Sequence, residues 1–253
     1  MEMQIPSQTN KVWLVELFRL SIFFDPTYAV SGNWWQEIVG DAPDVSNSQP
    51  KLGIKQDDGH YKDGKLVLST ILGRADWVYI PAFDYEINNL DHQRLPEFTA
   101  TLQDFVDIAN RVLNLNIPIK RIALGVILHI PVQDRIEGYS ELIRYVSDVK
   151  INPENSSDFL YQINKRRKSE NFADLFINRL THWSVAIGTL TKINFLAPID
   201  NNLIIEEHFY TRLEMDINTA QEYSGGFSKA QTIPLFLELT QLSAEIAEKG
   251  LIP

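Results

Sequence analysis

Apolar and polar residues follow two different spacings along the first part of the chain, and each spacing predicts one kind of element. Runs rich in aromatic and β-branched residues predict strands, and the glycines between them supply turns. These strands are expected at residues 11–24, 51–56, 65–72 and 77–83, with turns at 57–64 and 73–76. Apolar residues three or four positions apart predict helices at 31–40 and 95–113. The segment 41–50 has the composition of a loop.

The same order of elements then begins again. Strands are expected at residues 119–130, 158–167, 182–190 and 203–217, a short helix at 136–147 and a long helix at 234–250. Each half therefore reads strand, short helix, three strands, long helix, and both long helices open with Pro-x-Phe. We expect an internal duplication with halves 1–118 and 119–253 that together form one continuous domain. An unrelated α+β arrangement with the same element order is the alternative.

Two such halves can form one α+β fold, in which a large, mainly antiparallel sheet of about eight strands carries both long helices on one face. This element order resembles the fold of the TATA-box-binding protein, a saddle with helices on its convex side. The strand "VWLVELFRLSIFF", together with "RLEMDIN" before the terminal helix, is also similar to a sporadically distributed bacterial family of uncharacterised proteins of similar length. That second resemblance implies no activity.

Charge and cysteine usage limit the classes of function. The net charge is −10, from 23 basic and 33 acidic residues, with −7 before residue 119 and −3 after it. Such a field disfavours non-specific binding to nucleic acid or to anionic membranes. The absence of cysteine excludes disulfides and cysteine nucleophiles. No apolar run approaches the ~20 residues that span a bilayer, and the start of the chain is polar, so we expect a cytoplasmic protein.

The candidate ligand site lies on the strand expected at 203–217. Side chains alternate between the two faces of a strand, and the odd positions from 205 to 217 are mostly apolar. They belong beneath the helices. The even positions then face water or a partner, and they include His208, Tyr210, Arg212, Glu214 and Asp216.

Pairing with the neighbouring strands would add Arg166 and His182 to this open face. The small residues Ser184, Ala186 and Gly188 would leave a shallow trough between the longer side chains, which is where we expect a ligand. The alternative is a set of cross-strand ion pairs on a hydrated sheet, worth ~0.2–1 kcal/mol each.

Two further features are candidates for contact with a partner. Trp34 and Trp35 are adjacent on a short helix, so they cannot share one core-facing stripe, and one is expected to be partly exposed, as an interface anchor, or to lie under a loop. Packing at the edge of the core is the alternative. The basic run Lys165, Arg166, Arg167 and Lys168 could contact an anionic partner, or could be a solvated loop.

No sequence motif points to catalysis. The histidines show no metal-binding spacing, and phosphate-loop, dinucleotide and hydrolase-elbow motifs are missing, so we expect no cofactor and assign no catalytic or metal residue. Our first hypothesis is a non-catalytic protein- or ligand-binding module that uses the open face of the sheet. The alternatives are a hydrolase or metal-dependent nuclease that uses acidic residues on 203–217, and a nucleic-acid-binding saddle.

Overall fold

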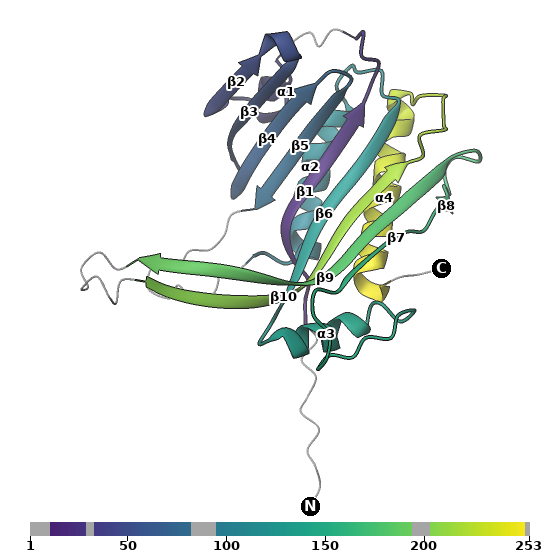
Figure 1. Cartoon of the computed structure of the whole chain (residues 1–253). Helices are drawn as coiled ribbons and strands as arrows, with labels where there is room; N and C mark the ends of the chain where they lie inside the picture. The colour runs from purple at the N-terminus through teal and green to yellow at the C-terminus, as the bar shows by residue number, and fades with distance from the viewer. Residues whose placement is uncertain (1–10, 29–32, 82–94, 194–202, 251–253) are drawn as a thin grey trace, which may run out of the picture.

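A computed structural model describes residues 11–28, 33–81, 95–193 and 203–250, with the backbone alone at 190–193 and 203–206. Ten strands form one sheet in which every pairing is antiparallel (Figure 1). The strands are β1 (Leu14–Phe23), β2 (Val45–Gln49), β3 (Ile54–Tyr61), β4 (Gly64–Ile71), β5 (Arg74–Pro81), β6 (Arg121–Val132), β7 (Leu160–Asn164), β8 (Arg167–Lys168), β9 (Phe176–Ile193) and β10 (Leu203–Thr219). The helices are α1 (Trp34–Val39), α2 (Phe98–Leu113), α3 (Arg135–Ile143) and α4 (Lys229–Lys249), and η1 (Pro50–Leu52) is a short 3₁₀ turn.

The sheet is built outward from its two central strands. Its order is β2-β3-β4-β5-β1-β6-β10-β9-β7, and β8 pairs with β9. Next to β1 lie β5, β4 and β3, which precede the long helix α2 in the chain. Next to β6 lie β10, β9 and β7, which precede the long helix α4. The expected α+β class with a large antiparallel sheet is confirmed, although β2 and β8 raise the strand number above eight. The internal duplication and the division at residue 118 stay predictions.

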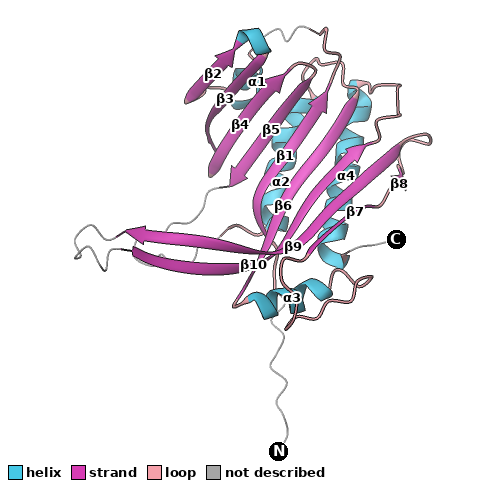
Figure 2. Ribbon diagram, viewed as in Figure 1, coloured by secondary structure: helices cyan, strands magenta, loops and turns pink. Residues whose placement is uncertain are grey.

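The two long helices cover a single face of the sheet and contact each other (Figure 2). Phe18 of β1 stacks on Phe98 and Phe105 of α2, with ring centroids 5.9 and 4.9 Å apart. Phe105 in turn contacts Phe236 of α4 at 6.2 Å. These aromatic contacts join sheet and helices into one core, because large apolar side chains gain most from removal from water. None of the described helices lies on the opposite face of the central strands (Figure 2).

Several element boundaries differ from the sequence predictions; for example, β9 begins at Phe176, six residues before the expected start, and β5 begins at Arg74, within the expected turn. Helix α4 begins at Lys229, five residues before Pro234, because Ser228 and Gln231 form a capping box that satisfies the free N–H groups of the first turn. Strand β2 lies within the expected loop and pairs with β3 along its whole length. Strand β3 continues through the expected turn as far as Tyr61, so the chain reverses only at 62–63.

The β9–β10 hairpin is longer than the sheet that supports it. The two strands pair from Leu203 opposite Ile193 to Thr219 opposite Ile177. β10 pairs with β6 only from Phe209 onward, and β9 pairs with β7 no farther than Ser184. The outer part of the hairpin therefore projects from the sheet as a two-stranded arm (Figure 1). Among the described residues, no helix combines the length and the apolar character that crossing a bilayer requires.

The division of the sheet into a covered and an open face predicts that a substitution on the covered face lowers the free energy of unfolding much more than one on the open face. Leu213 is fully buried under the helices, so Leu213→Ala should lower the free energy of unfolding by about 2–5 kcal/mol. Ser184, next to Arg212 on the open face, provides the control, and Ser184→Ala should change it by less than about 0.5 kcal/mol. Urea denaturation measures both values, and equal losses would contradict the division.

Candidate functional site

Strand β10 separates its side chains as the alternation predicts. Leu213, Met215 and Ile217 are at most 3% exposed beneath the helices. The even-numbered side chains from 208 to 218 are half-buried on the other face. The expected parity is therefore confirmed from 211 to 217. It fails at Glu207, which is exposed, and at Phe209, which is half-buried, because the hairpin leaves the sheet there; the side chain of Ile205 lies outside the described residues.

The register also gives the polar residues the neighbours expected from the sequence. Glu214 lies opposite His182, Arg212 opposite Ser184, and Gln162 of β7 continues the row beside His182. Arg166 is placed elsewhere. It lies beyond the end of β7, where its guanidinium stacks 4.9 Å from the ring centroid of Phe176 and pairs with Glu222.

His182 and Phe176 are six positions apart on one strand, about 20 Å. Arg166 therefore shares the face of the sheet but not the trough, and its assignment to the ligand site is corrected. The reason is that the chain leaves β7 after Asn164 and pairs again only at β8, so the alternation of 158–167 is interrupted before Arg166.

Strands β1 and β6 contribute residues that the sequence reasoning missed. The carboxylate Oε2 of Glu16 lies 2.9 Å from Nε2 of His129 and 3.4 Å from Nη1 of Arg212. Nε of Arg212 donates to Oε1 of Glu214 at 3.0 Å, and Nδ1 of His182 lies 3.8 Å from the same oxygen. A continuous row of alternating acids and bases thus crosses β1, β6, β10 and β9.

A trough of about 260 Å³ borders this row. One wall is the ion pair of Arg19 with Asp216 at 3.3 Å, and another is formed by His182 and Glu214. Gly125 of β6 makes the arrangement possible, because a Cβ atom there would lie 3.1 Å from the guanidinium of Arg19. The remaining lining side chains are Leu17, Val126, Ile127, Gln162, Leu180 and Met215.

Two polar atoms of residues that line the trough have no hydrogen-bond partner. They are Nε of Arg19 and Nε2 of His182, and both are buried. A buried polar group without a partner costs about 1–3 kcal/mol. Both atoms are covered by the protein, and Nε of Arg19 lies against Gly125. A molecule in the trough would therefore contact the exposed parts of the Arg19 and His182 side chains, which are 33% and 29% exposed.

Three candidates on β10 do not line the trough, and of these Arg212 adjoins it through its hydrogen bond to Glu214. Tyr210 lies over Gly188, with its ring centroid 5.1 Å from that of His129, and burial raises the pKa of its hydroxyl. His208 lies opposite Gly188, toward the projecting arm. Tyr210 therefore closes one end of the polar row, whereas His208 belongs to the base of the arm.

The structure buries both tryptophans of α1, so neither is exposed as an interface anchor, and the alternative of packing at the edge of the core is observed. Trp34 is 5% exposed and meets the ring of Phe24 edge-on, while Trp35 is 1% exposed and packs on Gly59 of β3. Adjacent side chains on a helix do point in different directions, as the sequence argument assumed. Here α1 lies between the segment after β1 and strand β3. Trp34 packs against the first and Trp35 against the second.

The basic run is largely neutralised by neighbouring carboxylates. Lys165 lies 3.4 Å from Asp148, Arg166 pairs with Glu222, and Arg167 pairs with Glu170. Lys168 is exposed at the end of the run. These contacts are typical of a solvated loop, the alternative that the sequence left open.

No group of three or more histidine, cysteine, aspartate or glutamate side chains that could hold a metal ion occurs within the described part of the chain. Comparisons with family models, curated proteins and solved structures gave no match to this chain. The two resemblances drawn from the sequence therefore stay expectations.

The contacts of Glu16 give the polar row a specific dependence on pH. Its hydrogen bond with His129 and the charge of Arg212 lower the pKa of Glu16 below its ordinary value near 4.5, against the effect of burial. A carboxyl whose pKa is lower in the folded state contributes stability that is present above the unfolded pKa. This contribution is lost as the pH falls through the folded pKa.

Glu16→Gln should therefore lower the free energy of unfolding at pH 7, by about 1 kcal/mol or less because the carboxylate is partly exposed. The difference from wild type should shrink as the pH falls below 4.5 and vanish once the pH has passed the lowered pKa of Glu16 in the folded protein. Urea denaturation at a series of pH values measures it, with the exposed Glu154→Gln as control. A difference that grows in acid would show that Glu16 does not act as an ionised partner.

Proposed function

We propose that the protein is a non-catalytic binding module that receives an extended segment of a partner protein on the open face of its sheet. The observation that carries this proposal is the trough beside the row of acids and bases, which is lined by the partly exposed side chains of Arg19, His182 and Glu214. A peptide group has both a donor and an acceptor, so it can pair with basic and with acidic side chains. Leu17, Ile127 and Leu180 add apolar surface for a side chain.

The state of the carboxylates supports binding rather than catalysis. Glu214 accepts from Arg212, and Asp216 is paired with Arg19 and accepts from Asn218. A general base or a metal ligand needs a carboxylate that is open to substrate or ion. These oxygens are instead engaged with neighbouring side chains, which gives the face a fixed pattern of donors and acceptors.

Charge also favours a protein partner over nucleic acid. The trough and the adjoining row contain three carboxylates, of Glu16, Glu214 and Asp216, against the guanidinium groups of Arg19 and Arg212. Phosphate recognition requires an excess of positive charge. We also propose a cytoplasmic location, with which the absence of cysteine is compatible.

Selection of random peptides on the immobilised protein tests the proposal, followed by titration calorimetry with the selected peptides. The double variant Arg212→Ala/Glu214→Ala should bind them at least about tenfold more weakly, as loss of a central interface contact does. Its melting temperature should stay nearly unchanged, because both side chains lie on the open face.

The matched control is Glu245→Ala/Lys249→Ala, which removes an acid–base pair on α4 while leaving the open face intact. This variant should bind the peptides as the wild type does. Equal binding by both double variants would refute the proposal, as would unfolding of Arg212→Ala/Glu214→Ala.

A further inference from the structure

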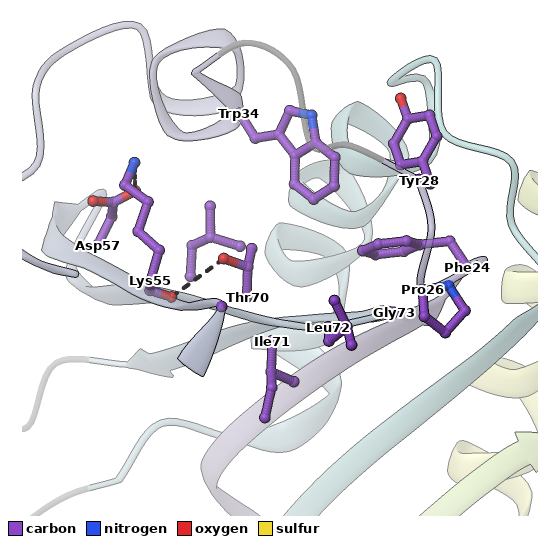
Figure 3. A pocket seen from close by; sticks show the side chains of 12 residues that line it. Phe24, Pro26, Tyr28, Trp34, Lys55, Asp57, Thr70, Ile71, Leu72 and Gly73 are labelled. Atoms are coloured by element: carbon purple, nitrogen blue, oxygen red, sulfur yellow. Dashed lines mark hydrogen bonds and ion pairs between the residues drawn. The ribbon is translucent and has the colours of Figure 1, made fainter. Parts of the chain in front are cut away.

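A second cavity lies at the other end of the sheet, on the face that carries the helices. It has a volume of about 290 Å³ and lies between α1, the segment after β1 and the strands β3 and β4 (Figure 3). Aromatic rings from Phe24, Tyr28 and Trp34 stand along one side, and Lys55 and Asp57 lie at the opposite end. This cavity shares no lining residue with the trough of the open face.

The three rings form an angular enclosure. The ring centroid of Phe24 lies 5.9 Å from that of Trp34 at an interplanar angle of 85°, and 5.8 Å from that of Tyr28 at 74°. Edge-to-face rings of this kind present electron-rich faces in different directions, and such faces attract cations. The aromatic side therefore suits an organic group that carries or adjoins a positive charge.

The polar end of the cavity holds a buried carboxylate. The side chain of Asp57 is 1% exposed, and its Oδ1 accepts from Oγ of Ser46 at 2.6 Å. Its Oδ2 lies 2.7 Å from Nζ of Lys55, whose side chain is 47% exposed. A buried carboxylate requires a cation or hydrogen-bond donors. Here the cation is supplied by a flexible, half-exposed lysine that can turn toward solvent.

We propose that this cavity binds a small aromatic primary ammonium compound, whose ammonium group takes the position of the Lys55 ammonium at Asp57 while its ring lies among Phe24, Tyr28 and Trp34. The contact between Lys55 and Asp57 shows that the carboxylate accepts an ammonium group in this place. The charge of −7 on residues 1–118 also favours approach of a cation.

Three probes with the same ring and similar length separate the possible ligand chemistries, namely phenethylammonium, 2-phenylethanol and 3-phenylpropanoate. Binding to the whole chain is followed by NMR through the indole N–H signal of Trp34, assigned with Trp34→Phe. Phenethylammonium should bind at least about fivefold more tightly than 2-phenylethanol, because it alone gains the ion pair with Asp57. The propanoate should bind most weakly, since Asp57 repels it.

Substitutions at the ion pair give the sharper test. Lys55→Gln frees Asp57 of its competing ammonium and should tighten phenethylammonium binding at least about threefold. Lys65→Gln is the matched control, because Lys65 pairs with Asp58 on the same hairpin but outside the cavity, and it should leave binding unchanged. Asp57→Asn should reduce phenethylammonium to the affinity of the alcohol.

The proposal is overturned if no probe binds, if the alcohol or the propanoate binds as tightly as the amine, or if Lys55→Gln fails to tighten amine binding. Circular dichroism checks the fold of each variant. Should Asp57→Asn fail to fold, Lys55→Gln and its control decide the outcome alone, because Asp57 keeps its contact with Ser46 in both.

Discussion

The covering of the sheet on one face only is the constraint on which the other features of the molecule depend. In β1, β6 and β10 a side chain that points toward α2 and α4 enters the core, where Leu20, Leu128 and Leu213 are fully buried. Its neighbour in the chain must point the other way. The aromatic packing of Phe18 and Phe105 secures the covered side, and thereby leaves the charged residues Arg19, His129 and Arg212 on the uncovered surface. Thr211 is a polar residue on the covered side, where its hydroxyl donates to the backbone oxygen of Gly138.

The uncovered surface is ordered by its own charges. Glu16, Arg212 and Glu214 each contact a side chain of opposite charge, and Arg19 does the same with Asp216. Exposed ion pairs contribute little stability one at a time, so the network is better suited to holding a pattern of donors and acceptors than to holding the fold together. Gly125 and Gly188 give Arg19 and Tyr210 room to lie against the sheet.

Much of this arrangement could be predicted from the sequence, because alternation and helical spacing act over a few neighbouring residues. The two faces of the inner part of β10 follow from alternation, and so does the presence of His182 on the same face as Glu214. That the two residues lie directly opposite each other depends on the strand register, which alternation leaves open. The contacts of Arg212 with Glu16 of β1, and of Glu16 with His129 of β6, could not be predicted from the sequence. The register of β1 on β6 shifts between Val15 and Leu17, and no local pattern reveals which residue of β6 lies opposite Glu16.

The other differences have equally local causes. Pro234 suggested the first turn of the last helix, because a proline there leaves no N–H group unpaired. The helix begins earlier because Ser228 and Gln231 form a capping box around the first turn. The burial of Trp34 and Trp35 could not be predicted, because it depends on β3 and on the segment after β1, which meet α1 only in the folded chain. In the segment "VELFRLSIF", Glu16 and Arg19 are charged residues among apolar ones, and this was the sequence signal that could have placed them on the open face.

Single-cysteine labelling along β10 tests the division of faces most directly, and the native chain contains no cysteine to interfere. Cysteine is placed at each position from 210 to 217 in turn, and its rate of reaction with a soluble thiol reagent is compared with the rate in denaturant. We expect the even positions to react readily in the folded protein, and Leu213, Met215 and Ile217 to be strongly protected. Rates that do not alternate, or that show protection at 212 and 214, would contradict the open face.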